Sequence, residues 1–155
     1  MEKAKSTYMY GRFAAMIATS TVVMYGLMYL NTLQLDHLTF SETRAYMALL
    51  MGAAMAGLML AFMTKMYANR RVNICIFVGS AVLFGLALWF VRSQATVGDV
   101  AYMKGMIPHH SIAILTSERA RIMDPRVRKL ADQIIQSQRK EIADMKALIE
   151  DLEHN

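Results

Sequence analysis

Cysteine is almost absent from this chain, and other absences exclude several kinds of protein. The single cysteine, Cys75, cannot form an internal disulfide, so it does not indicate a redox compartment and is interpreted as a small apolar packing residue. The sequence has no Gly-rich phosphate loop, no Cys/His zinc spacing, no Ser/His/Asp arrangement and no Glu-x-x-His motif of a di-iron bundle. We therefore expect that the protein is not an enzyme.

Charge is missing from three long stretches, residues 13–35, 45–64 and 72–91, in a chain that is 55% apolar. A helix needs about 20 predominantly apolar residues to cross a bilayer, and each stretch reaches that length. The sequence predicts three transmembrane helices, at about 13–30, 46–66 and 72–91. The uncharged stretches contain no Asp, Glu, Lys, Arg or His. This argues against an active transporter, because ionisable groups inside the membrane usually mark ion-coupled pathways.

The charges between these stretches predict an orientation in the membrane. Basic residues dominate the N-terminal tail and the loop between the second and third spans: Lys3, Lys5, Arg12, Lys65, Arg70 and Arg71. The loop between the first and second spans carries Asp36 and Glu42 against Arg44. We expect a multi-pass protein of the bacterial inner membrane, with a cytoplasmic N-terminus and a periplasmic C-terminal segment. The net charge of +5 then reflects membrane topology and not a nucleic-acid interface.

After the last apolar stretch the composition changes, which divides the chain into a membrane anchor, residues 1–92, and an extramembrane domain, residues 93–155. Apolar residues in the domain follow the helical period over about 99–121 and from 125 to about 150. Asp124 and Pro125 are good N-cap and first-turn residues for the second helix. The sequence predicts an all-α fold ending in an antiparallel hairpin. Because a hairpin of this size buries little core, we predict a homodimer or higher homo-oligomer in which two hairpins form a four-helix bundle.

The segment MKGMIPHHSIAI, residues 103–114, gathers soft donor atoms on the first of these helices. Met103, Met106 and His110 are spaced i, i+3, i+7 and align on one helical face. His109 is turned by about 100° from His110, so both histidines cannot point into one small site without distortion. Pro108 kinks the helix or starts a new one, so spacing alone does not decide which histidine faces the site.

Counting back from a turn near residue 124 indicates which residues face this segment, to within one helical turn. His110 then lies opposite Gln138, Met103 lies opposite Met145, and Glu141 is close to the same stripe. Thioether and neutral imidazole ligands suit Cu(I) or Ag(I) better than zinc. From the residues alone, a soft-metal site and ordinary core packing are both open interpretations.

The second apolar stretch has methionines at steps of four: Met47, Met51, Met55, Met59 and Met63. One interpretation is a copper path, because thioethers select Cu(I). However, steps of four advance by about 40° each on a helix, so the methionines spiral around it and do not line one straight face. The other interpretation is flexible apolar packing. Gly52 with Ala56 forms a small-xxx-small pair that permits close helix approach.

The run MKGMIPHHSIAI, followed by DPRVRKLADQIIQSQRKEIADM, resembles the domain of unknown function 305 family over about residues 99–152. The resemblance implies a ferritin-like helical fold, as in periplasmic copper-binding proteins of the CopM type. It also implies a metal site outside the cytoplasm, with first-helix ligands and less direct second-helix contributors: Met103, Met106, His109, His110, Glu141 and Met145. The leading hypothesis is a membrane-anchored protein that binds Cu(I) or Ag(I) for tolerance or for delivery to a copper-handling partner. The alternatives are a three-helix copper conduit and a structural module whose hairpin only oligomerises.

Overall fold

The computed structural model describes residues 2–30 and 32–154, with side chains described from Ser6 onward. These residues form five α-helices, one 3-10 helix and no strand, so the predicted all-α class is confirmed. The elements are α1 (Glu2–Leu27), η1 (Leu35–His37), α2 (Glu42–Met63), α3 (Arg70–Ser93), α4 (Asp99–Arg119) and α5 (Pro125–His154). They divide into two compact units, one containing α1, α2 and α3 and the other containing residues 28–42 with α4 and α5.

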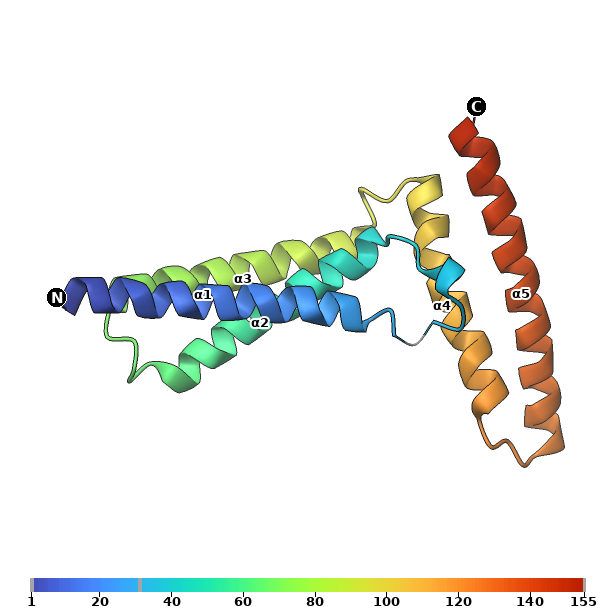
Figure 1. Cartoon of the computed structure of the whole chain (residues 1–155), viewed down its shortest axis with the longest axis horizontal. Coiled ribbons are helices and arrows are strands. Elements are labelled where there is room, and N and C mark those ends of the chain that lie inside the picture. Colours follow the sequence, from blue (N-terminus) through green and yellow to red (C-terminus); the bar gives the residue numbers. More distant parts are fainter. Residues whose placement is uncertain (1, 31, 155) are drawn as a thin grey trace. The chain divides into compact units, whose positions relative to one another are not determined.

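The helices α1, α2 and α3 of the first unit lie alongside one another (Figure 1), and all three contribute to one apolar cluster. Phe13 of α1, Leu60 of α2 and Tyr67 just beyond α2 are its buried centre, and Ile76 of α3 packs against it. The rings of Phe13 and Tyr67 meet edge to face, with centroids 5.4 Å apart. Aromatic and aliphatic side chains at matching positions on the three helices therefore determine how they associate.

Gly52 of α2 lies close against Thr21 of α1. A Cβ atom at this position would lie 2.3 Å from the side-chain oxygen of Thr21, a distance that real Cβ atoms do not show. Gly52 and the neighbouring Ala53 are both buried. The small residues of α2 therefore admit the neighbouring helix, as the small-xxx-small spacing predicts.

Two helices of the first unit, α2 and α3, are long and apolar enough to cross a membrane. In α3, which is described over its whole length, Ala87 is the only buried residue, and large apolar side chains such as Val78 and Leu86 are more than half exposed. The predicted first span at about 13–30 is not among the candidates, and α1 ends at Leu27. The three-span anchor therefore remains a prediction, with α2 and α3 as its supported part.

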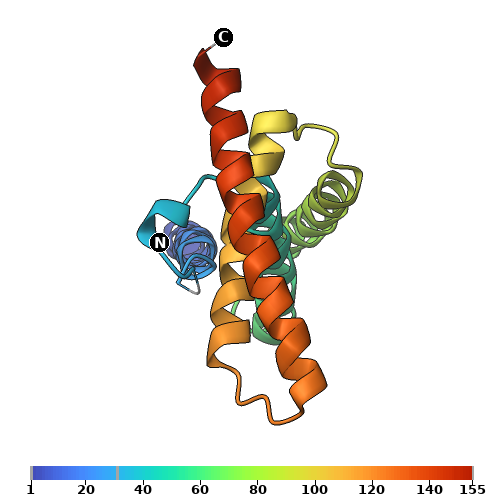
Figure 2. The same ribbon diagram turned by 90° about the vertical axis from the view of Figure 1, so that its right-hand side faces the viewer.

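In the second unit, α4 and α5 lie side by side and run in opposite directions, joined by residues 120–124 (Figures 1 and 2). Ile107 and Ile114 of α4 and Ile142 of α5 form the buried core between them. Asp124 accepts a 2.8 Å hydrogen bond from the backbone N–H of Arg126, which satisfies one of the free donors at the start of α5. Arg126 also holds the pKa of Asp124 below its usual value, mainly through a side-chain hydrogen bond.

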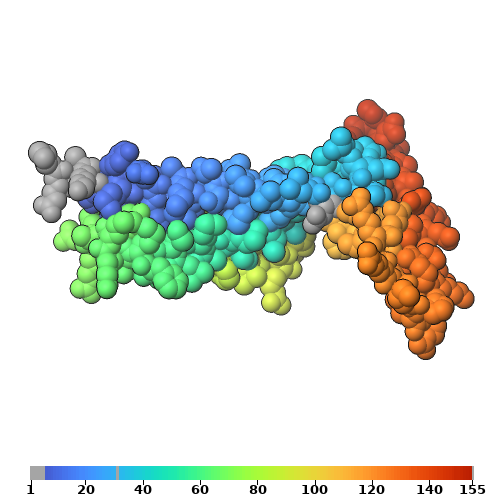
Figure 3. All heavy atoms as spheres, turned by 60° about the horizontal axis from the view of Figure 1, so that its bottom comes forward, coloured from blue at the N-terminus to red at the C-terminus, as the bar shows by residue number. Residues whose placement is uncertain are grey.

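The loop formed by residues 28–42 packs against α4, where Figure 3 shows it in cyan against the orange helix. Leu33 adds its side chain to the isoleucine core, and its backbone N–H donates to the Ser111 hydroxyl at 2.7 Å. A Cβ atom on Gly105 would lie 3.2 Å from the Ser41 hydroxyl oxygen, so glycine gives the loop room to approach the helix here.

Pro108 explains a further contact of the loop. The helix α4 continues through Pro108, so no new helix starts there. Because proline has no N–H, the carbonyl oxygen of Lys104 one turn earlier lacks its helical donor. The hydroxyl of Thr39 in the loop donates to that oxygen instead. The proline thus opens a hydrogen-bonding position on α4 that the loop occupies.

Candidate functional site

His110 and Glu141 form the central polar contact between α4 and α5. Nε2 of His110 lies 2.7 Å from Oε2 of Glu141, and Nδ1 lies 2.9 Å from the carbonyl oxygen of Met106. Because a carbonyl oxygen only accepts, the Nδ1 hydrogen donates to it, which fixes the orientation of the ring and directs Nε2 at the carboxylate. The His110 residue is only 7% exposed.

Glu141 is itself positioned by its own helix. The hydroxyl of Ser137, one turn earlier, donates to Oε1 of Glu141 at 2.6 Å. This bond, followed by the hydrogen bond with His110, lowers the pKa of Glu141 below its usual value. The carboxylate therefore stays ionised near neutral pH and presents one oxygen to each neighbour.

The other predicted site residues lie at different depths around this pair. Met103 is buried, Met106 and Met145 are half-buried, and Met145 packs against the isoleucine core. His109 is exposed, with its ring centroid 6.1 Å from that of His110. The question that spacing left open has a structural answer: His110 points into the hairpin and His109 points away from it.

The residue that faces His110 lies three positions from the one that counting indicates, which is within the accuracy of one helical turn. Counting back from the turn placed Gln138 opposite His110, whereas the structure places Glu141 there. The shift is within one helical turn, and it arises because packing of Ile107 and Ile114 against Ile142 sets how far the two helices slide past each other.

The number of ligands decides whether His110 and Glu141 of one chain can bind a metal ion by themselves. Over residues 6–30 and 32–154, whose side chains the structure describes, no three His, Cys, Asp or Glu side chains lie together in a way that could hold a metal ion. A metal bound by His110 and Glu141 would therefore need further ligands from methionine sulfur or from a second molecule. Methionines supply the only other soft donors in this neighbourhood among the described residues, since the single cysteine lies in α3.

Sequence reasoning missed the polar contacts that hold the loop to the domain. His37 is 6% exposed, and its Nδ1 lies 3.0 Å from the hydroxyl oxygen of the fully buried Ser111. Burial is the main cause that lowers the pKa of His37. Asp36 binds Lys146 of α5, and this hydrogen bond is the main cause that lowers the pKa of Asp36. Pro108 was the one sequence signal for this docking, since it frees a carbonyl group on the helix.

The loop also brings together a serine, a histidine and an aspartate, an arrangement that the sequence did not reveal. Ser111 contacts His37, whose Nε2 lies 3.9 Å from Asp36, too far for a hydrogen bond. The Ser111 hydroxyl has no exposed surface and accepts the N–H of Leu33. A substrate cannot reach it in this position, so the trio acts as a structural contact.

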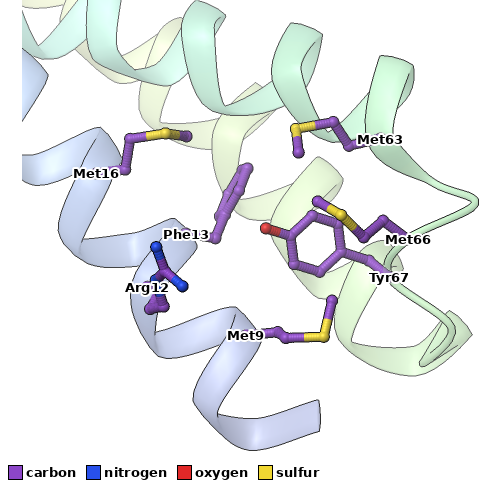
Figure 4. Close-up of a pocket in the computed structure, with 7 residues that line it drawn as sticks. All are labelled: Met9, Arg12, Phe13, Met16, Met63, Met66 and Tyr67. Atoms are coloured by element: carbon purple, nitrogen blue, oxygen red, sulfur yellow. The ribbon is translucent and has the colours of Figure 1, made fainter. Parts of the chain in front are cut away.

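A separate hollow in the first unit is rich in methionine (Figure 4). Met9 and Met16 of α1 and Met63 and Met66, at and beyond the end of α2, line it together with Phe13, Tyr67 and Arg12. Its volume is about 500 Å³. Met63 is the last of the regularly spaced methionines of α2, and it is the member of that series that lines the hollow.

Comparison with known proteins shows which protein family the helices α4 and α5 match. The family model described as a domain of unknown function, DUF305, matches residues 99–155, which contain α4 and α5. Uncharacterized protein L153 of Acanthamoeba polyphaga mimivirus is 30% identical over 144 residues, which cover 88% of this chain and 93% of that protein. The chain belongs to the DUF305 family. No solved structure matches it.

The DUF305 domain alone is much shorter than the region shared with the viral protein. An alignment over 88% of the chain therefore includes a large part of the first unit as well. The similarity between the two proteins is thus not confined to the residues that match the DUF305 model. All the residues considered above as metal ligands lie within the DUF305 domain.

Proposed function

We propose that this protein is a membrane-anchored Cu(I)- or Ag(I)-binding protein, with its DUF305 domain outside the cytoplasm. The His110–Glu141 contact carries the proposal. Nδ1 of His110 forms a hydrogen bond with a backbone carbonyl oxygen. Such a bond commonly orients a metal-binding histidine and leaves Nε2 as the ligand atom. Nε2 lies 2.7 Å from Oε2 of Glu141, and a metal ion bound by Nε2 would replace this contact.

The surroundings of this pair favour a soft metal. Met103 and Met106 precede His110 by two turns and one turn on α4, and Met145 follows Glu141 by one turn on α5. Thioether and imidazole together select Cu(I) or Ag(I), whereas Ca²⁺ and Mg²⁺ prefer sites made of oxygen ligands. We propose Met103, Met106 and His110 as ligands. Glu141 and Met145 contribute from the second helix, and the exposed His109 serves as an entry ligand.

The proposed location rests on the two apolar helices and on the loop. The helices α2 and α3 return the chain to the side from which it started, and residues 28–42 and the DUF305 domain belong to one compact unit. The loop before α2 and the domain after α3 therefore share one side of the membrane. The basic residues between α2 and α3 favour the cytoplasm for the opposite side, which would be the case in a bacterial inner membrane.

The proposal is tested by titrating the full-length protein in detergent with Cu(I) against a chromogenic Cu(I) chelator. Replacing His110 with alanine should weaken binding by about tenfold or more. His154→Ala, which removes an exposed histidine at the end of α5, serves as the control and should bind like the wild type. Absence of Cu(I) binding, or equal affinity of the His110→Ala variant, would reject the function. A change in stability alone would favour the structural-module alternative.

A copper conduit through the first unit is the second candidate, and the methionine-lined hollow of Figure 4 is the observation that favours it. The guanidinium of Arg12 lines the same hollow and opposes a cation there, which is why we rank this function below binding. Metal uptake into proteoliposomes distinguishes a copper conduit from a copper-binding protein. Uptake that is unchanged when Met51, Met55 and Met59 are replaced by leucine would eliminate the conduit.

A further inference from the structure

One face of α5 carries a row of exposed apolar side chains. The exposed fractions are 50% for Val127, 56% for Leu130, 36% for Ile134, 52% for Leu148 and 50% for Leu152. At about 100° per residue, all five lie within about 40° of Glu141 around the helix. Exposed apolar rows of this length on a helix mark an interaction surface. Glu141, which holds His110, sits in the middle of the row.

This row is distinct from the surface that α5 packs against α4. Ile142 and Ala131, the buried residues of α5, are turned by about 80–100° from Glu141. Lys146, which binds the loop through Asp36, is turned further in the same direction, by about 140°. The loop thus covers one side of the α4–α5 pair, and the apolar row belongs to the other side.

The pattern of apolar and polar residues in the row is nearly the same when followed from either end of α5. Val127, Leu130 and Ile134 precede its centre, which lies between residues 139 and 140. Leu148 and Leu152 follow at positions that mirror Leu130 and Val127 to within one residue. The polar residues Ser137 and Glu141 occupy the centre. A contact between identical molecules across a two-fold axis requires such a self-complementary surface. The row therefore suits a second copy of α5 that runs in the opposite direction.

The charges of α5 favour the same pairing. Its first two turns are basic, with Arg126, Arg128 and Lys129, and its last turns are acidic, with Glu150, Asp151 and Glu153. Antiparallel copies place each basic end beside the acidic end of the other copy. Parallel copies would place like charges together. Charge complementarity thus selects the antiparallel arrangement.

We propose that α5 pairs antiparallel with α5 of a second copy, and that this contact completes the metal site. This inference rests on the function proposed above. A centre between residues 139 and 140 offsets the two Glu141 residues by about three positions, or about 4.5 Å along the helices. Two His110–Glu141 pairs then share one gap and supply four nitrogen and oxygen ligand side chains, whereas one chain supplies one such pair beside its methionines.

Metal binding and pairing are coupled in this arrangement. Two carboxylates in one gap repel each other unless a cation lies between them. A cation bound by both copies therefore stabilises the dimer relative to the separate chains. The polar centre also fixes the register, since sliding by one turn would place Glu141 against apolar side chains of the other copy.

Disulfide trapping tests the direction of pairing. In a full-length Cys75→Ser background, V127C and L152C chains are mixed in detergent with Cu(I) absent and oxidised gently. Antiparallel pairing predicts disulfides that join one variant to the other, because position 127 faces position 152. The control is a mixture of V127C and Q136C chains, whose cysteines do not face each other in this pairing. Disulfides within each variant alone, or no more disulfides between V127C and L152C than in the control mixture, would overturn the proposal. Gln136 lies on the far side of α5, about 140° from Glu141.

Native mass spectrometry of the full chain in detergent tests the shared site. We expect one Cu(I) for two chains, and about tenfold or more weaker dimerisation for Leu130→Glu, with Gln136→Glu as the matched control. One Cu(I) for each monomer would overturn the shared site while the proposed function stands. If antiparallel dimers are trapped but the protein binds no Cu(I), both the proposed function and the shared metal site are rejected. Only the pairing of the α5 helices would then stand. The pairing would be rejected if the protein were monomeric and the apolar row of α5 were inserted into lipid.

Discussion

Replacing Ser111 with alanine should release the loop from the DUF305 domain. The Ser111 hydroxyl is fully buried, accepts the N–H of Leu33 at 2.7 Å and lies 3.0 Å from Nδ1 of His37. Alanine fits the same space but leaves the backbone donor of Leu33 and the ring nitrogen of His37 without this partner. Both groups lie in the packed part of the contact between the loop and α4.

The size of the effect follows from the two groups left unpaired. A buried polar group without a partner costs about 1–3 kcal/mol, and Leu33 is only half-buried, so the loss in docking free energy should be about 2–4 kcal/mol. At about 1.4 kcal/mol for each factor of ten, the open population of the loop should rise by about 30-fold to about 700-fold. The loop remains attached through Thr39 and through Asp36, so the domain itself should stay folded.

Hydrogen exchange of amides in residues 32–41, measured on the full chain in detergent, reports this opening. Thr116→Ala is the control, because that hydroxyl is exposed and only bonds to carbonyls of its own helix. Equal protection of the loop in the two variants would refute the reasoning.

In the wild type, protection should also fall as the pH drops below about 6.5, since burial lowers the pKa of His37 and the released loop binds the proton more readily.

Three further predictions concern other contacts. Ile142→Ala should lower the free energy of unfolding of the domain by about 2–5 kcal/mol, measured by chemical denaturation, because it opens a cavity in the isoleucine core. Because the folded-state pKa of Glu141 is lowered, its contribution to stability should be present at neutral pH and be lost as the pH falls below about 4.5. Thermal unfolding of metal-free Glu141→Gln should lack that loss, and an identical acid profile in both proteins would contradict the assignment. Gly52→Ala should disrupt the packing of α1 on α2, and the further change Thr21→Ala should restore it, as measured by thermal stability in detergent.

Local signals in the sequence were enough to predict the helices of the DUF305 domain. Asp124 and Pro125 mark the start of α5, and the apolar period marks its length, because both depend only on residues within a few turns. The end of α4 was less well defined: it stops at Arg119, two residues before the expected position. The chain leaves the helix early there because residues 120–124 form the turn.

The contacts between distant segments could not be predicted in the same way. Which residue meets His110 depends on the packing between α4 and α5, and spacing gives that only to within a turn. His37 and Ser111 are 74 positions apart, and nothing near either one in the sequence indicates the other. The role of Pro108 was visible only as a disturbance of the helix. Its consequence, a carbonyl that accepts a hydrogen bond from the loop, needed the structure.

The docking of the loop imposes an order on how the protein is made. Residues 28–42 leave the ribosome well before α4 is synthesised, so His37 and Ser41 have no cover while α2 and α3 are being made. The second unit is assembled from two separated parts of the chain and can close only after Ser111 has been synthesised. Until then the loop exists as an exposed polar segment, and maturation of the domain is the last step of biogenesis.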